Sequence, residues 1–152
     1  LRSVEILRKA FERPAITTDV IVGFPQESEE EFEETKAFLE KVGFFEMHIF
    51  KYSKRKGTIA AGMQGQVADM VKTERSNILL EMEKRQSKEF RSYYLGKEAE
   101  VLFEEQKSIG GKVYQLGHTA DYVKVAVETD EDWTNQFRKV AISGFLTDEI
   151  LI

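Results

Sequence analysis

The sequence predicts a two-part protein of the α/β plus β class: βα units of a barrel-like parallel sheet, a long linking helix, and a small antiparallel β-barrel. The order strand, acidic helix, strand across residues 17–51 is typical of a βαβ unit. Beyond Gly96 the hydrophobic period changes from the 3.6 residues of a helix to the 2 residues of a strand. Residues 1–92 carry 16 Lys and Arg and 16 Asp and Glu, whereas residues 93–152 carry 6 and 11. These differences predict a domain boundary near Tyr93, between parts 1–92 and 93–152.

The first part should contain two helices and two strands before the linking helix. Apolar residues at helical spacing predict a helix over residues 1–11, which Pro14 ends. The nearly continuous apolar run 16–24 is expected to be a parallel strand covered on both faces. Ser28 and Glu31 form a capping-box pattern for the acidic helix, and Gly43 predicts where that helix ends. A second strand should cover residues 44–50.

The second part begins after a long helical stretch. Residues 66–94 contain neither Pro nor Gly and carry apolar side chains at spacings of three, four and seven, which predicts the linking helix. Short alternating stretches separated by glycines follow. They favour a five-stranded barrel of the oligonucleotide-binding type over residues 93–152.

Composition excludes several classes of protein. The chain has 152 residues, of which 41% are hydrophobic and 32% charged, as in a soluble globular protein. No apolar run approaches the roughly 18 residues of a membrane span, so we expect no membrane association and a cytoplasmic location. Without cysteine and with two histidines, the chain has no predicted metal site. Because it begins at Leu1 inside an expected helix, we interpret it as a piece of a longer protein.

Several segments resemble the radical S-adenosylmethionine (SAM) methylthiotransferases, in the order found in that family. Residues 16–25 (ITTDVIVGFP) and 48–58 (HIFKYSKRKGT) resemble the end of the radical SAM barrel, together with Gln66 and residues 72–75 (KTER). Residues 117–125 (GHTADYVKV) resemble the family's C-terminal TRAM domain, a small RNA-binding β-barrel. The match is closest to the MtaB type within the MiaB/MtaB family. The family usually has glycine at the position of Gln26, in a turn.

The resemblance implies the last βα units of a partial TIM-like radical SAM barrel followed by a TRAM domain. The complete enzyme would be a transferase in tRNA modification that adds a methylthio group to C2 of N6-threonylcarbamoyladenosine beside the anticodon. Its cofactors would be SAM and two 4Fe-4S iron-sulfur clusters. Because the cluster-binding CxxxCxxC motif is not in this chain, the fragment should ligate neither cluster and should be inactive alone.

Candidate pocket residues follow the two expected parallel strands. Asp19 is a carboxylate within an apolar strand and must be hydrogen-bonded, paired or solvated, either structurally or at a site. Tyr52, Ser53 and Arg55 follow the second strand, at the end where a barrel's pocket opens. The resemblance implies that these residues border the pocket for SAM and the target nucleoside. The alternative is that residues 52–55 form a solvated turn without a role in binding. No residue is predicted to be catalytic.

Two groups of residues are candidates for binding tRNA at the anticodon arm. The basic loop Lys51, Lys54, Arg55 and Lys56 can neutralise phosphates, although solvated basic loops are common. In the second part, His118, Tyr122 and Lys124 combine aromatic rings with a cation, as in proteins that hold unpaired RNA. The alternative for Tyr122 is to cap the barrel core, and the alternative for His118 is only to brace its turn.

Two alternative functions stay open at the level of sequence. The chain could be a non-catalytic RNA-binding or assembly module. It could also belong to a methylthiotransferase acting on isopentenyl-adenosine tRNA or on a ribosomal protein. Unpaired edges of an incomplete parallel sheet also favour self-association of the fragment.

Overall fold

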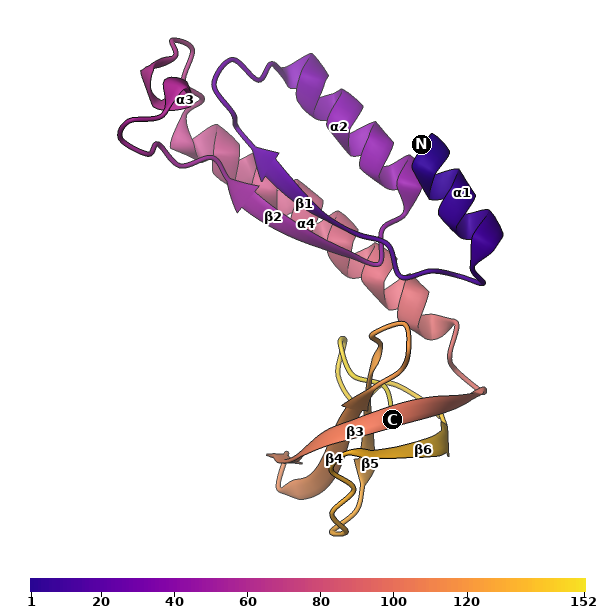
Figure 1. The fold of residues 1–152 in the computed structure, drawn as a ribbon. Coiled ribbons are helices and arrows are strands. Elements are labelled where there is room, and N and C mark those ends of the chain that lie inside the picture. Colours follow the sequence, from indigo (N-terminus) through magenta and orange to yellow (C-terminus); the bar gives the residue numbers. More distant parts are fainter. The chain divides into compact units, whose positions relative to one another are not determined.

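The computed structural model describes all residues from Leu1 to Ile152 (Figure 1). The chain divides into two compact units, Leu1–Ser87 and Lys88–Ile152. The N-terminal unit contains, in order, α1 (Arg2–Ala10), β1 (Thr17–Val22), α2 (Glu29–Val42), β2 (Glu46–Lys51), α3 (Ile59–Gly62) and most of α4 (Asp69–Ser92). The C-terminal unit contains β3 (Glu98–Ile109), β4 (Lys112–His118), β5 (Lys124–Glu128) and β6 (Gln136–Ala141).

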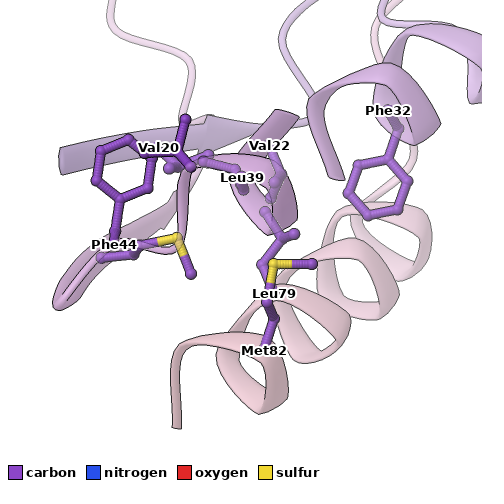
Figure 2. Packing of buried hydrophobic residues seen from close by; sticks show 9 residues of the cluster. Val20, Val22, Phe32, Leu39, Phe44, Leu79 and Met82 are labelled. Carbon is purple, nitrogen blue, oxygen red and sulfur yellow. The ribbon is translucent and has the colours of Figure 1, made fainter. Parts of the chain in front are cut away.

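Strands β1 and β2 form a two-stranded parallel sheet in which Asp19 lies opposite His48 and Ile21 opposite Phe50. One face packs against α2 and α4 through a cluster of buried residues (Figure 2): Val20, Val22, Phe32, Leu39, Val42, Phe44, Met47, Leu79 and Met82. Burying each large aliphatic side chain of this cluster contributes about 1.5–3 kcal/mol. This core holds the ends of β1 and β2 beside the start of α4.

The opposite face of the parallel sheet is exposed. Ile21 is 57% exposed and Phe50 53%, and Asp19 and His48 are exposed beside them. The expectation that the first strand is covered on both faces is therefore wrong for this chain, because both helices that pack on the sheet cover the same face. Two parallel strands do not by themselves define a TIM-like barrel.

Helix α2 begins and ends as its sequence predicts. The hydroxyl of Ser28 accepts a hydrogen bond from the N–H of Glu31 at 3.2 Å, and the Glu31 carboxylate accepts one from the N–H of Ser28 at 2.8 Å. Gly43 ends the helix with a left-handed φ of 61°. Hydrogen bonds from its own backbone N–H and from the Ser28 hydroxyl hold the pKa of Glu30 below its usual value. The acidic residues at the start of α2 thus stabilise the N-terminus of the helix.

The C-terminal unit is an antiparallel sheet with the strand order β5-β4-β3-β6. A bulge between Phe103 and Glu105 shifts the register of β3 against β4. The predicted fifth strand is reduced to isolated bridges from Leu151 to Val125 and Phe145. The preceding residues form a tight turn instead, in which the N–H of Leu146 donates to the carbonyl of Ile150 at 2.8 Å. None of the helices is both long and apolar enough to cross a membrane.

Candidate functional site

A cleft of about 790 Å³ opens where β2 ends. Its lining comes from two segments, the end of β2 with the residues that follow it and the start of α4 with the residues that precede it: Lys51, Tyr52, Ser53, Lys54, Gln66, Val67, Ala68, Asp69 and Lys72. Ligands of open α/β sheets bind at this carboxyl end of the strands. The cleft is therefore the candidate ligand site of the N-terminal unit.

Lys72 is a largely buried cation in the lining. Its residue is 7% exposed, and its Nζ lies 3.1 Å from Oδ1 of Asp69 and 5.6 Å from the ring centroid of Tyr52. Its stem runs against Gly23, where an added Cβ would clash with the Cγ of Lys72. Gly23 also has a left-handed φ of 72°. Glycine at this position thus allows the lysine to reach the cleft.

Two polar atoms of lining residues are buried without a hydrogen-bond partner: the hydroxyl of Tyr52 and Oε1 of Gln66. The Gln66 amide nitrogen donates to the carbonyls of Ala60 and Met63, at 3.0 and 2.9 Å, so its oxygen remains as an acceptor. A buried polar group without a partner costs about 1–3 kcal/mol. A ligand that hydrogen-bonds to these atoms would remove that cost.

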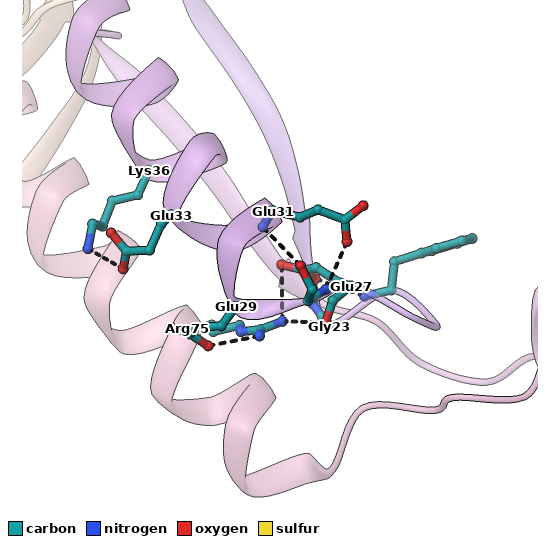
Figure 3. A network of polar contacts seen from close by, with 9 residues as sticks. Gly23, Glu27, Glu29, Glu31, Glu33, Lys36 and Arg75 are labelled. Carbon is teal, nitrogen blue, oxygen red and sulfur yellow. Dashed lines mark hydrogen bonds and ion pairs between the residues drawn. The ribbon is translucent and has the colours of Figure 1, made fainter.

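A buried ion pair fixes the turn that follows β1 (Figure 3). The Glu27 carboxylate accepts hydrogen bonds from the N–H groups of Gly23 and Phe24, the latter at 3.1 Å. Arg75 of α4 lies 3.3 Å from Glu27 Oε1 and 3.0 Å from Glu29 Oε2. The side chains of Arg75 and Glu27 are only 6% and 14% exposed, so the pair ties α4 to the backbone beside the cleft.

Only part of the predicted N-terminal site gathers at this cleft. Tyr52 and Ser53 line it, as do the predicted RNA-binding residues Lys51 and Lys54. Three other predicted residues are exposed and do not line the cleft: Asp19, Arg55 and Lys56. The sequence analysis did not select three of the polar lining residues, which lie at the start of α4 or just before it: Gln66, Asp69 and Lys72. Gln66 and Lys72 belong to segments that carry the family resemblance, which is the signal that could have found them. Their approach to β2 depends on the path of the β2–α4 loop.

The predicted aromatic group in the C-terminal unit comes together on the surface. The rings of His118 and Tyr122 stack with centroids 5.1 Å apart and planes 28° apart. His118 Nδ1 lies 2.6 Å from Oε2 of Glu104, which orients the imidazole. Lys124 lies directly opposite His118 in the β4/β5 pair. The structure thus places all three predicted residues side by side.

A tight turn presents Tyr122 to solvent. Its residue is 74% exposed, although its φ of 64° lies in the left-handed region that a tyrosine rarely adopts. Thr119 holds the turn, because its carbonyl accepts from the N–H of Tyr122 at 3.0 Å and its hydroxyl from the N–H of Val123 at 3.2 Å. Tyr122 therefore does not cap the barrel core.

Trp133 is a packed anchor for the acidic loop of this unit. Its ring meets the buried Phe103 edge-on at a centroid distance of 5.1 Å, and the Arg138 guanidinium lies 4.2 Å from its centroid. Hydrogen bonds from the Thr134 hydroxyl and backbone N–H hold the pKa of Asp132 below its usual value. This loop stays anionic and would repel phosphate.

Comparison with known proteins finds several similar methylthiotransferases. The chain is 42% identical over 137 residues to a threonylcarbamoyladenosine tRNA methylthiotransferase, MtaB, of Bacillus subtilis. It is 50% identical over 136 residues to a tRNA-2-methylthio-N(6)-dimethylallyladenosine synthase of Thermobifida fusca. A ribosomal protein uS12 methylthiotransferase, RimO, of Clostridium kluyveri is 40% identical over 107 residues.

These alignments cover 90%, 88% and 70% of this chain but only 30%, 28% and 24% of the respective relatives. The chain thus spans less than a third of the length of the relatives it matches. No family model matches the chain.

Proposed function

Since the chain is a homologue of the MtaB and MiaB methylthiotransferases and corresponds to a C-terminal part of them, we propose that it is part of a tRNA-modifying enzyme. The proposed reaction adds a methylthio group to C2 of N6-threonylcarbamoyladenosine next to the anticodon. The observation that carries this proposal is the extent of the similarity, which covers 88–90% of the chain in relatives 42–50% identical to it.

The N-terminal unit would supply part of the pocket for SAM and the target nucleoside. Bound SAM, together with a reduced iron–sulfur cluster, would supply the radical chemistry in the complete enzyme. This chain has no cysteine, so its own contribution would be binding. The unpartnered Tyr52 hydroxyl and the buried Lys72 cation fit a ligand with polar and anionic groups. We propose these two side chains, with Ser53, as ligand-holding residues of the cleft.

The exposed face of the parallel sheet supports a place in a larger barrel. Ile21 and Phe50 are large apolar side chains more than half exposed on this face, beside Asp19 and His48. In a closed barrel the face opposite the helices points inward, where other strands would cover the apolar residues. Asp19 would then lie at the barrel interior, where it could border the pocket as the sequence predicts.

The relatives include enzymes named for three different substrates, so the choice of nucleoside needs its own support. The threonylcarbamoyl substrate is favoured by the Gly117-His118-Thr119 segment with Tyr122 and Lys124, which resembles the MtaB type most closely. Action on dimethylallyladenosine tRNA or on a ribosomal protein, and a purely RNA-binding role, are the outcomes against which the proposal is tested.

The test is a chimera in which this chain replaces the matching part of the Bacillus subtilis relative. It would be expressed in cells lacking that relative, and the tRNA nucleosides would be analysed by mass spectrometry. We expect the methylthio derivative of N6-threonylcarbamoyladenosine to reappear, as it does with the intact relative as control. Methylthiolation of dimethylallyladenosine alone would overturn the substrate assignment. No methylthiolation from a folded chimera would overturn the enzymatic proposal.

A further inference from the structure

A row of four residues crosses the antiparallel sheet of the C-terminal unit. Lys124 of β5 lies opposite His118 of β4, His118 opposite Leu102 of β3, and Leu102 opposite Phe137 of β6. Directly opposed residues of an antiparallel pair point to the same face of the sheet. The four side chains therefore share one face, on which Tyr122 also lies because its ring stacks on His118.

This face exposes aromatic rings. Phe137 is 68% exposed and Tyr122 74%, which makes them the most exposed aromatic residues of the chain. Tyr122 keeps its exposure despite a left-handed φ, a conformation that costs about 1–2 kcal/mol and persists where the surrounding structure imposes it. Its ring is also stacked on that of His118, whose own orientation is set by Glu104.

Lysines flank the row along both edge strands. Lys124 ends the row on β5, and Lys139 lies two residues beyond Phe137 on β6, hence on the same face. Two carboxylates on this face have cationic or hydrogen-bonded neighbours, because Glu104 contacts His118 and Glu100 lies opposite Lys139. A third, Glu98, lies four residues from Leu102 along β3, opposite Ala141. A strand carrying phosphates would therefore meet cations at the two edges of the row and rings between them.

We propose that this face, made of Tyr122, His118, Leu102 and Phe137 with Lys124 and Lys139, binds unpaired RNA by stacking bases on its rings. The inference rests on the proposed function, in that the RNA would be the anticodon loop of the substrate. Phe137 and Lys139 are not among the residues that the sequence singled out, because their place beside His118 depends on the strand register.

The charge of the unit explains why stacking must supply the affinity. Residues 88–152 contain 8 Lys and Arg against 12 Asp and Glu, so the unit as a whole repels phosphate. Stacking on an aromatic ring contributes about 1–3 kcal/mol per base and requires no net positive charge. Binding at this face should consequently depend only weakly on salt.

Strand spacing limits how the RNA lies on the face. Phe137 and His118 stand on strands separated by one further strand, which places the two strands about 10 Å apart. Neighbouring bases within a stacked strand are about 3.4 Å apart. The two rings therefore receive bases that are unstacked from each other, and a paired stem cannot satisfy both positions.

The test is titration of the full chain against a fluorescein-labelled nine-residue oligouridylate, with a fully paired hairpin RNA as the comparison probe. Phe137→Ala and Tyr122→Ala should each weaken binding to the oligouridylate by about 5- to 100-fold. Phe137→Trp should keep the affinity within about 3-fold, because it retains a stacking ring. Phe11→Ala removes a similarly exposed aromatic side chain, 61% exposed, from the N-terminal unit and should change affinity less than about 2-fold.

Salt dependence gives a second readout that a structural role would not produce. Phe137→Ala should leave the salt slope unchanged, whereas Lys139→Ala should reduce it by about one unit. Circular dichroism would verify that each variant is folded. Unchanged affinity in both folded alanine variants, no oligouridylate binding at all, or equally tight binding of the hairpin would overturn the inference.

Two further results separate this inference from the proposed function. If Phe137→Ala abolishes self-association of the chain but leaves RNA affinity unchanged, the face binds a second copy and the inference fails. An active methylthiotransferase chimera whose RNA affinity is unaffected by Phe137→Ala would overturn the inference alone. An inactive chimera combined with ring-dependent RNA binding would overturn the proposed function alone.

Discussion

Gln26 occupies a turn position whose backbone conformation favours glycine. Its φ is 74°, in the left-handed region, and its N–H donates to the carbonyl of Gly65 at 2.7 Å. The turn therefore needs the conformation that glycine adopts freely, and the glycine usual at this position in the resembled family suits it. Glutamine holds the same turn at the cost of backbone strain.

Replacing Gln26 by glycine should stabilise the chain. We expect Gln26→Gly to raise the free energy of unfolding by about 1 kcal/mol, because relief of the left-handed strain outweighs the added flexibility of the unfolded chain. Denaturant unfolding measures the change. Ser53→Gly, at an exposed position without a positive φ, is the control and should lower stability by a few tenths of a kcal/mol. A destabilised Gln26→Gly variant would contradict the account of this turn.

The Tyr52 hydroxyl should affect both the stability of the chain and its binding of a ligand. Because it is buried without a partner, Tyr52→Phe should raise the free energy of unfolding by about 1 kcal/mol. In the methylthiotransferase chimera the same change should raise the KM for SAM or for tRNA, because a ligand contact is lost. Tyr122→Phe, whose residue is 74% exposed, should change stability by less than about 0.5 kcal/mol. A Tyr52→Phe variant with lower stability would mean that the hydroxyl already has a partner.

At the scale of elements, the Arg75–Glu27 pair connects α4 to the turn after β1. Arg75→Met would leave the Glu27 carboxylate, 14% exposed, without its cation. We expect a loss of about 3 kcal/mol in the free energy of unfolding, because removing one partner leaves an uncompensated charge that is largely buried. The exposed pair of Arg85 and Glu40, at 55% and 50% exposure, provides the control.

Arg85→Met should cost less than about 1 kcal/mol, because exposed ion pairs contribute little. Equal losses from the Arg75 and Arg85 variants, measured by denaturant unfolding, would show that the buried pair does not hold the turn. A further sign of the expected role would be increased hydrogen exchange at the N–H groups of Gly23 and Phe24, which donate to Glu27.

Sequence patterns predicted the elements better than their contacts. The capping box at Ser28 and the helix end at Gly43 were predictable, because both depend on interactions within a few residues. Long-range partners were not. The approach of Lys72 to Gly23 depends on loop path, and the row from Lys124 to Phe137 depends on register, which the bulge after Phe103 shifts.

The fifth strand illustrates a different limit. Alternation predicts a strand wherever polar and apolar residues interchange, but it does not show whether the backbone finds a partner. After β6, the N–H groups of Ser143 and Gly144 donate to the carbonyl of Ile152, and the Thr147 hydroxyl accepts from the N–H groups of Glu149 and Ile150. The exposed face of β1 and β2 has a similar origin, because a nearly continuous apolar strand does not reveal how much of its cover the same chain supplies.

At the scale of the whole molecule, the two units differ in the kind of surface that the proposed RNA partner would meet. The N-terminal unit carries the basic loop Lys51, Lys54, Arg55 and Lys56, whereas the C-terminal unit is acidic overall with exposed rings. The loop should contribute phosphate contacts that weaken with salt, and the rings should contribute salt-insensitive stacking. Together the two surfaces predict moderate salt dependence for binding of an anticodon stem-loop.

The central claim, that this chain serves tRNA recognition in a methylthiotransferase, is tested most directly by titrating it against an anticodon stem-loop at low and moderate salt. A scrambled hairpin is the control RNA, and a variant with Lys54, Arg55 and Lys56 changed to alanine is the control protein. We predict tighter binding of the stem-loop than of the hairpin, and a salt slope reduced by about three units in the variant. Equal or absent binding of both RNAs would contradict the claim.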